Sequence, residues 1–391
     1  MGSKPNTKYQ GQHTAESPMA LARVQVSLVP YILLLVAILG SCGTYGPYRD
    51  PTTNPASTQA SNRSLGQPYS KTGTSSGIFS GSQAPDSVSF LVLSDIHGYD
   101  KESLVQSQAT WNRHLIFWGK PQDTGFRNTK AVLDAAGHAD LPDFIVLPGD
   151  MTVDGELVSH KMLQGVLDNF RTANPSVPVY VTTGNHDVNS PQARRHGRLF
   201  TLPTLSVSPG GFASIYDNYG FSQALSRDTE SLSYVVEPVP GLALLMLDTA
   251  SWHKNMFFPI RVSNTKGIIR ESTLNWMEPL LAEARQLGMM IVVVQHHPLR
   301  VTDETEHQDS QKTDPINSVR TTALYQHFGV ALQLAGHRHR LHLDLDSATP
   351  HITAPSLSST PANAMLVGIG QDGVKALIDP YGFGSPELLP D

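Results

Sequence analysis

The sequence predicts an α/β fold in which a buried sheet carries functional loops at the ends of its strands. The chain has 391 residues, of which 39% are hydrophobic, so it is long enough to bury a large core. Short apolar runs typical of buried strands alternate with segments of helical composition. Five of these runs end directly before Asp, Asn or His, at the position where an open α/β sheet exposes its ligand site.

The first part of the predicted domain alternates strands and helices. The predicted strands are 87–93, 143–147 and 179–182. The predicted helices are 127–136 and 157–170, and the second has an apolar face. The stretch 111–122 shows no clear period. This order of elements predicts an α/β sandwich.

The segment that follows, from Gly184 to about Lys266, differs in composition. Pro, Gly and Ser are frequent in it, and its predicted helices are short. It contains two predicted strands, 232–237 and 242–247. We expect residues 188–266 to form an insertion that covers one rim of the site.

The last part returns to the alternating pattern, and the sequence contains no internal repeat. We expect Ser272 to cap a helix over 272–286 and Gly288 to end it. The remaining predicted elements are the strands 290–294, 331–334 and 341–345 and the helix 316–328.

Charge and cysteine content exclude several classes of protein. There are 28 Lys and Arg against 34 Asp and Glu, and this net charge of -6 gives no electrostatic footprint for a nucleic-acid polymer. Cys42 is the single cysteine. The chain therefore has no intramolecular disulfide framework, no four-cysteine zinc site and no CxxC redox centre.

The region before the predicted domain has the features of a targeting signal. Residues 29–39 form an uninterrupted apolar run of secretory length that is too short to span a membrane. The sequence Leu39-Gly40-Ser41-Cys42 resembles a bacterial lipobox, which implies cleavage before Cys42 and lipidation of its thiol. An uncleaved short anchor and a non-lipidated signal are the alternatives, and both still export the domain.

We therefore expect residues 1–42 to be a signal peptide, 43–85 a disordered tether and 86–391 the folded domain. The start residue is either Met1 or Met19. The expected location is that of an exported bacterial lipoprotein, anchored to a membrane and facing the periplasm or the cell exterior.

The five polar motifs, taken together and in order, resemble those of the calcineurin-like metallophosphoesterases. The family pattern is DxH, GD, GNH followed by D or E, a lone H, and GHxH. The motifs here are Asp95-Ile96-His97, Gly149-Asp150, Gly184-Asn185-His186-Asp187, His296-His297-Pro298 and Gly336-His337-Arg338-His339. The resemblance covers residues 87 to about 345 and implies a four-layer α/β/β/α sandwich of the metallophosphoesterase type.

The same resemblance implies a centre of two divalent or trivalent transition metal ions. One metal would bind Asp95, His97, Asp150 and His339. The other would bind Asp150, Asn185, His296 and His337, so that Asp150 reaches both metals. Imidazole, carboxylate and amide ligands suit Mn, Fe, Zn or Co rather than calcium.

Four residues beside these ligands have expected roles of other kinds. The family pattern makes His186 a donor to a phosphoryl oxygen or to the leaving alkoxide. Asp187 is expected to orient a ligand or to close its own turn. His297 is expected to lie outside the ligand set, because the family places the ligand two residues before the proline. Arg338 either contacts a substrate phosphate or is solvated.

The partner of His186 is left open by the sequence. Phosphatases of the superfamily often carry an Asp three residues after the bridging Asp, but here that position is Val153, and Asp154 follows it. Glu156 and His160 form either a surface pair one turn apart or a support for the site. The histidines without ligand spacing, most of which we expect at the surface, are His13, His114, His138, His160, His196, His253, His307, His327, His342 and His351.

The charge of the expected centre favours a phosphate ester as the substrate. Two divalent ions with the two carboxylates of Asp95 and Asp150 leave a net charge of about +2. The stretch from Gly149 to Arg195 looks like the cyclic-nucleotide phosphodiesterase branch. We expect hydrolysis of small phosphodiesters, with cyclic nucleotides as the leading class, by attack of a hydroxide held between the metals. The alternatives are a phosphomonoesterase of nucleotidase or acid phosphatase type, and a surface lipoprotein whose metal site is not catalytic. The sequence leaves the oligomeric state open.

Overall fold

The computed structural model describes residues 77–118, 124–257, 261–299, 317–359, 363–378 and 387–388. The chain divides into the units Met1–Gln67, which lies outside these residues, and Pro68–Asp391. The predicted signal, Cys42 and the predicted tether up to residue 76 therefore lie outside the described part. No helix in the described ranges is long and apolar enough to cross a bilayer.

Residues 77–85, which we expected in the tether, lie on the domain. Phe79 is buried in an apolar cluster with residues of the second sheet and its helices. Ser80 N donates to Glu237 Oε2 at 2.9 Å, and Ala84 N donates to Gly288 O at 3.1 Å. These contacts place the edge of the domain before residue 86.

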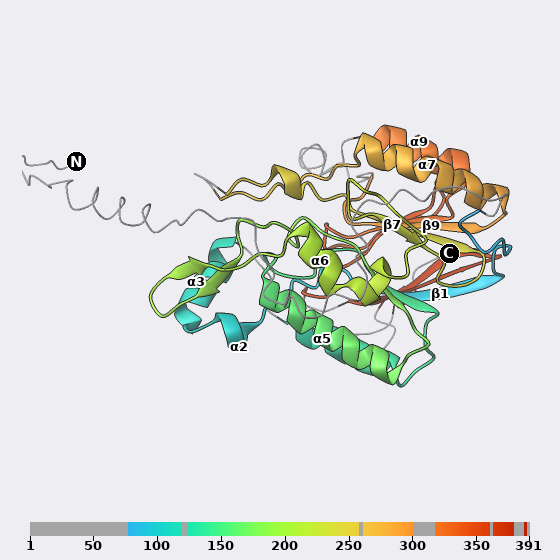
Figure 1. Ribbon diagram of the computed structural model, residues 1–391. Coiled ribbons are helices and arrows are strands. Elements are labelled where there is room, and N and C mark those ends of the chain that lie inside the picture. The colour runs from blue at the N-terminus through green and yellow to red at the C-terminus, as the bar shows by residue number, and fades with distance from the viewer. Residues whose placement is uncertain are drawn as a thin grey trace, which may run out of the picture. The chain divides into compact units, whose positions relative to one another are not determined.

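Two sheets form the centre of the unit (Figure 1). The first has the order β15 (Glu387–Leu388), β14 (Gly373–Ile378), β13 (Met365–Gly370), β1 (Ser87–Val92), β2 (Phe144–Leu147) and β3 (Val179–Val181). The second has the order β11 (His342–Asp344), β12 (His351–Thr353), β10 (Leu332–Ala335), β9 (Met290–Gln295), β8 (Leu242–Leu247), β7 (Tyr234–Val236) and β6 (Ser226–Arg227). A separate hairpin pairs β4 (Arg194–His196) with β5 (Thr201–Pro203).

Helices cover the outer faces of both sheets. On the first sheet, α4 (Gly125–Ala136) and α5 (Leu157–Ala173) contribute buried residues to the main core. On the second sheet, α7 (Glu271–Gln286) places Leu274 and Met277 in one buried apolar cluster with Leu245 and Val293. Next to α7, α9 (Ser318–Phe328) adds Tyr325 to the same cluster. The α/β/β/α arrangement predicted from the sequence is confirmed, and burial of the apolar strands is its main source of stability.

The remaining helical elements lie in the connections. They are α2 (Lys101–Leu104), α3 (Gln108–Trp118), α6 (Pro209–Ile215), the π-helical turn η1 (Asp217–Phe221) and the 3-10 turn η2 (Trp252–Lys254).

Three expectations about individual elements need correction. The predicted insertion includes β6, β7 and β8, and β8 lies between β7 and β9 with every residue buried, so residues 226–247 belong to the second sheet. Ser272 lies inside α7, whose N-cap is Arg270. A helix, α3, forms in the stretch without clear period, where Trp111 is buried against Tyr99.

The parallel strands fix the position of the site. β1, β2 and β3 are mutually parallel, as are β8, β9, β10 and β12. Their carboxyl ends therefore share one edge of each sheet. On its other side, β1 pairs with β13 in an antiparallel register from Ser87↔Gly370 to Val92↔Met365.

Candidate metal centre

The loops that follow β1, β2, β3, β9 and β10 converge at this edge and bring all seven predicted metal donors together. Their backbone is unusual. Seven non-glycine residues in the described ranges have positive φ, and five of these are predicted donors: Asp95, His97, Asp150, His337 and His339. Left-handed backbone costs about 1–3 kcal/mol at each non-glycine residue, and such residues cluster at functional sites. The surrounding structure therefore holds these loops in a conformation that the loop sequences do not themselves favour.

Glycines in the motifs allow the loops to approach one another. A Cβ atom on Gly184 would lie 2.1 Å from Asp150 Oδ1, and one on Gly336 would lie 2.4 Å from Ser94 Oγ. Gly149 has φ +92° and lies against the backbone of Gly184. The glycines of the GD, GNH and GHxH motifs thus leave room for the carboxylates.

The first group of donors consists of Asp95, His97, Asp150 and His339. The Nε2 atoms of His97 and His339 are 3.0 Å apart. His339 Nε2 is 3.3 Å from Asp95 Oδ1, and His97 Nε2 is 3.6 Å from Asp150 Oδ2. Two ring nitrogens and two carboxylates therefore point at one small volume, which a cation would fill.

The second group of donors surrounds His296 Nε2. This atom lies 3.1 Å from Asn185 Oδ1, 3.2 Å from His337 Nδ1 and 3.3 Å from Asp150 Oδ2. Asp150 Oδ2 thus faces both groups. Its other oxygen, Oδ1, accepts from His186 N at 2.9 Å. A single oxygen of Asp150 therefore lies between the two groups.

Hydrogen bonds from outside the groups orient these donors. His296 Nδ1 donates to Pro148 O at 2.9 Å, which leaves the lone pair on Nε2. Asp95 accepts from Ser94 Oγ, and both of its oxygens accept from His337 N, at 3.0 and 3.1 Å. Ser356 Oγ donates to Asp95 O at 2.8 Å.

The electrostatics favour the metal-binding protonation states of Asp150 and His337. Burial raises the pKa of Asp150, but the neighbouring His296 and His186 outweigh it and hold that pKa well below its usual range. Burial lowers the pKa of His337 well below its ordinary value. At His296 and His339, burial is outweighed by Asp150 and Asp95, which raise the pKa of His296 to about 9 and that of His339 above its ordinary value. An ionised carboxylate and a neutral imidazole are the forms that bind metals. The donor set fits transition metal ions such as Mn, Fe or Zn.

His297 lies beside the second group but is held by other partners. Its Nε2 donates to Thr265 O at 3.1 Å, so its Nδ1 carries the lone pair and accepts from Thr249 Oγ1 at 2.8 Å. Both ring nitrogens are therefore used. His296 Nε2 faces Asn185 and Asp150, and His297 lies with His296 and His337 in a group of histidines that could hold a metal ion.

His186 pairs with Asp154, which the sequence argument left in doubt. His186 Nδ1 donates to Asp154 Oδ1 at 3.2 Å, and Asp154 Oδ2 lies 3.8 Å from His114 Nε2. The expected position, Val153, is instead buried in an apolar cluster with Tyr99 and Trp111. The sequence feature that could have indicated this pairing is Asp154 directly before Gly155. Gly155 has a φ of +74° and turns the chain there.

Asp187 and His160 stabilise the loop that carries His186. Asp187 accepts from Met151 N at 2.9 Å and from Gly184 N at 2.8 Å, so it joins the GD and GNH motifs. Burial, and then Asp150, raise the pKa of Asp187 to about 6. His160 Nε2 donates to Asp187 O at 3.0 Å. Burial lowers the pKa of His160 to about 4.

The expectation that most remaining histidines lie at the surface fails for four of those that the structure describes. The buried ones are His114, His160, His196 and His351, whereas His13 and His307 lie outside the described residues. Glu156 is buried too and accepts from Asp154 N at 3.2 Å, so it supports Asp154 rather than forming a surface pair with His160. Arg338 lies near enough to His337 and His297 to add to the lowering of their pKa values, behind burial.

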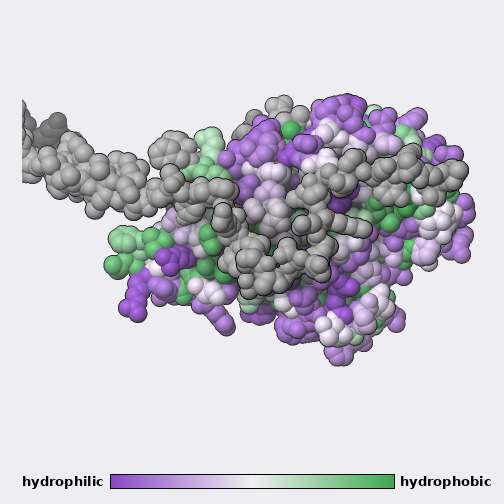
Figure 2. Space-filling model, in the orientation of Figure 1, coloured by the Kyte–Doolittle hydropathy of each residue, from purple (hydrophilic) through white to green (hydrophobic). Residues whose placement is uncertain are grey.

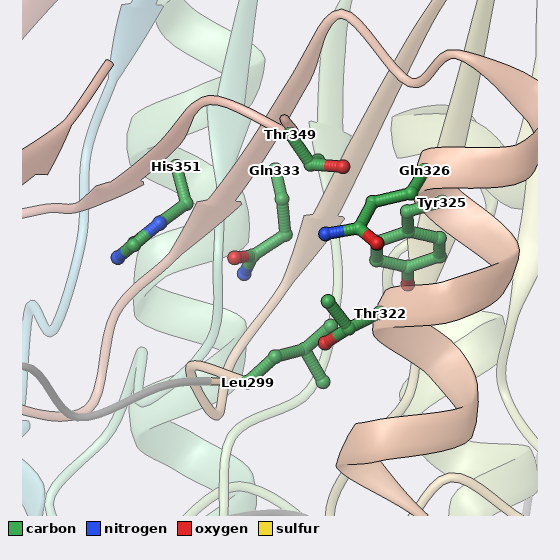
Figure 3. A pocket seen from close by; sticks show the side chains of 7 residues that line it. All are labelled: Leu299, Thr322, Tyr325, Gln326, Gln333, Thr349 and His351. Atoms are coloured by element: carbon green, nitrogen blue, oxygen red, sulfur yellow. The ribbon is translucent and has the colours of Figure 1, made fainter. Parts of the chain in front are cut away.

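A separate cavity of about 20 Å³ lies between α9 and the strands β10 and β12 (Figure 3). Its lining residues are Leu299, Thr322, Tyr325, Gln326, Gln333, Thr349 and His351. Gln333 Nε2 and Thr349 Oγ1 have no hydrogen-bond partner in the described part of the chain. This volume holds about one water molecule, and the lining contains no predicted metal donor, so the cavity is not the reaction site.

The chain is similar to several known proteins. A family profile described as calcineurin-like phosphoesterase matches residues 88–341, more than half of the chain. Sphingomyelin phosphodiesterase 2 of Caenorhabditis elegans is 24% identical over 166 residues, which are 40% of this chain and 26% of that protein. The match thus spans about a quarter of that relative's length. A dimetal phosphatase from Danio rerio shares the fold, with a TM-score of 0.50 and 14% identity over 77% of this chain and 98% of that chain.

Proposed function

This chain belongs to the calcineurin-like phosphoesterase family, a family of metal-binding hydrolases, and we propose that it is a metal-dependent phosphodiesterase. One observation carries the proposal. Asp150 Oδ2 lies within 3.6 Å of a histidine nitrogen in each of two donor groups. A single oxygen with this position can join two cations, which is the arrangement that clamps the attacking and leaving oxygens of a phosphoryl transfer.

The proposed ligands are those that the family motifs assign. Asp95, His97, Asp150 and His339 would hold one ion. Asp150, Asn185, His296 and His337 would hold the other. When bound, the ions supply Lewis acidity toward the phosphoryl oxygens and lower the pKa of a water molecule. Mn, Fe and Zn are the proposed metals because the donors mix nitrogen and oxygen.

The residues of the chain itself position the substrate and move a proton. His186 is the proposed general acid, because its ring lies beside His97 with ring centres 5.2 Å apart. Asp154 accepts from His186 Nδ1, so Nε2 is the ring nitrogen that would donate to the leaving alkoxide. Asp154 is a positioning residue, since it fixes the ring without contacting the substrate.

Two considerations support a diester substrate. The C. elegans relative is named as a phosphodiesterase, and the stretch from Gly149 to Arg195 resembles the cyclic-nucleotide branch. Cyclic nucleotides are therefore the first soluble diesters to test. A phosphomonoesterase is the second candidate, because the surplus charge of about +2 also suits a monoester dianion.

The test uses the full chain before and after removal of its metals. Rates would be measured on bis-p-nitrophenyl phosphate, p-nitrophenyl phosphate and a cyclic nucleotide, with elemental analysis of each sample. We expect diester hydrolysis to disappear on chelation and to return with Mn, Fe or Zn. Activity that survives complete metal removal contradicts the mechanism, and a faster monoester rate assigns the phosphomonoesterase. Full metal occupancy without turnover on any ester supports the non-catalytic alternative.

We also propose that the chain is exported and anchored through a lipid on Cys42. The support is the apolar run 29–39 directly before the lipobox-like sequence. Mass spectrometry of the amino-terminal peptide, with a Cys42→Ser variant as the control, would show whether the lipid is present.

A further inference from the structure

Two surface regions beside the metal centre expose apolar side chains to solvent, and we call them the first and second arms. The first arm consists of α3 and the β4–β5 hairpin, residues 108–118 and 194–205. The second arm consists of residues 252–257 and 261–266. Their exposed apolar residues, between 40% and 83% accessible, are Ile116, Leu199, Phe200, Leu202 and Leu205 in the first arm and Met256, Phe257 and Val262 in the second. Exposed apolar groups of this density mark interaction surfaces.

Hydrogen bonds and buried side chains hold the two parts of the first arm together. Thr110 Oγ1 donates to Gly197 O at 3.0 Å, which joins α3 to the hairpin. The rings of Trp111 and His196 lie 5.0 Å apart beneath it, and both residues are fully buried. Figure 1 shows α3 and the hairpin at one end of the view, and Figure 2 shows apolar surface gathered over them. The apolar tip is therefore presented by a packed base.

Both arms begin at the rim of the metal centre. The β4–β5 hairpin of the first arm follows the loop of His186 and Asp187 in the chain. The second follows β8 through Thr249, which contacts His297. Asn255 Nδ2 donates to Asn189 O at 3.0 Å, so the second arm contacts the segment that leads into the β4–β5 hairpin.

The charge of the arms is opposite to that of the whole chain. Together these segments contain Lys and Arg but no Asp or Glu, although the chain carries a net charge of -6. Their basic residues are Arg113, Arg194, Arg195, Arg198, Lys254, Arg261 and Lys266. Apolar side chains flanked by Arg and Lys are the composition that inserts into the boundary of a bilayer with anionic lipids.

We propose that the two arms dock on an anionic lipid bilayer and hold the metal centre against its surface. The apolar tips enter the acyl boundary, and the seven basic residues lie among the anionic headgroups. This surface goes beyond the proposed hydrolysis and does not depend on it.

The test labels single positions of the full chain with the environment-sensitive dye NBD. In a Cys42→Ser background no native cysteine remains, so Phe200→Cys, Phe257→Cys and Val319→Cys each carry one label. Val319 is the matched control, because it is 85% exposed on α9. With vesicles of mixed phosphatidylcholine and phosphatidylglycerol, we expect the emission of the labels at 200 and 257 to rise and shift to the blue, and the label at 319 to stay unchanged.

A variant with fewer basic residues provides the second part of the test. Arg195→Gln with Arg198→Gln should weaken binding to these vesicles by roughly 30-fold, since each basic residue near such a surface contributes to affinity. The matched control is Lys130→Gln with Lys375→Gln, two exposed lysines of α4 and β14 whose loss should have no effect.

Three results would overturn the proposal. The first is an unchanged label at 200 and 257 while the chain binds vesicles, which would show attachment through another region. The second is an equal change at 319. The third is a dimer in solution that Phe200→Ser dissociates, which would make the arms an interface between copies. None of these readouts involves turnover, so failure here and failure of the proposed hydrolysis are distinguishable.

Discussion

The metal centre and the two arms lie side by side, yet they are built on opposite principles. At the centre, polar side chains are buried and the backbone is held at positive φ, so the fold forces unfavourable conformations into one small volume. In the arms, no described residue has a positive φ, and the apolar side chains are exposed. The difference indicates that the chemistry of the centre requires particular residues at particular positions. Binding by the arms requires only that enough apolar and basic side chains are exposed. Substitutions in the two regions should therefore have very different effects.

Asp150→Ala should have the largest effect, because it removes a donor that both metal-binding groups share. Because the Asp150 oxygen lies between both donor groups, its loss should release metal from both and lower turnover by roughly 10³-fold or more. Elemental analysis and rates on a soluble diester would measure this. Asp248→Asn is the matched control, since Asp248 is buried at the same edge but accepts from Thr183 and Ala250 instead. Retained metal in Asp150→Ala would contradict the assignment.

His186→Ala should separate proton transfer from metal binding. We expect kcat to fall by roughly 10²–10⁴-fold with metal content near that of the wild type, because a general acid contributes to the barrier and not to the ions. The kcat of Asp154→Asn should fall less than that of His186→Ala. Both variants should lose more activity on alkyl esters than on p-nitrophenyl esters, because the p-nitrophenolate leaving group needs no proton. Equal metal loss in His186→Ala and Asp150→Ala would show that His186 is a ligand.

His160 should make the stability of the centre depend on pH. Its folded pKa of about 4 lies below the ordinary 6.5, so folding favours the neutral ring. The stability that it contributes is complete above pH 6.5 and is lost as the pH falls toward 4, by roughly 3 kcal/mol in all. Denaturant unfolding of the metal-free chain between these pH values would measure the loss. His160→Gln should flatten this dependence, and His138→Gln, at an exposed position, should not.

The smallest effect is expected in the arms. Phe200→Ser should change the free energy of unfolding by less than about 0.5 kcal/mol, because the ring is already in water. Its rate on a soluble diester should equal that of the wild type. Phe90→Ala, which removes a fully buried ring from the core, should cost about 3–5 kcal/mol in the same measurement. A large loss from Phe200→Ser would show that the arm supports the fold.

The sequence predicted the strands and the donor residues for a local reason. Each motif comes directly after an apolar run, and burial of that run in a parallel sheet brings its carboxyl end to the common edge. The runs ending at Leu93, Leu147 and Val294 all became strands of the two sheets. Local sequence and global fold agree at these positions, which is why they could be predicted.

Features that depend on distant contacts could not be predicted in this way. The pairing of His186 with Asp154 requires two loops to meet, and the antiparallel pairing of β13 with β1 joins residues far apart in the chain. The exposure of Leu199 and Phe200 follows from a hairpin whose partner, α3, lies in a stretch without a clear period. The positive φ values at Asp95 and His337 come from the packing around them and leave no mark in the sequence.

The strand β13 has a practical consequence for anyone who shortens this chain. A fragment that stops soon after the GHxH motif would encode every metal donor, yet it would lack the antiparallel neighbour of β1 and the serine that binds the carbonyl of Asp95. Its first strand would then present an open edge to other molecules in the cell. Such a fragment should precipitate or be degraded during expression, so the catalytic motifs do not mark where the working gene product can end.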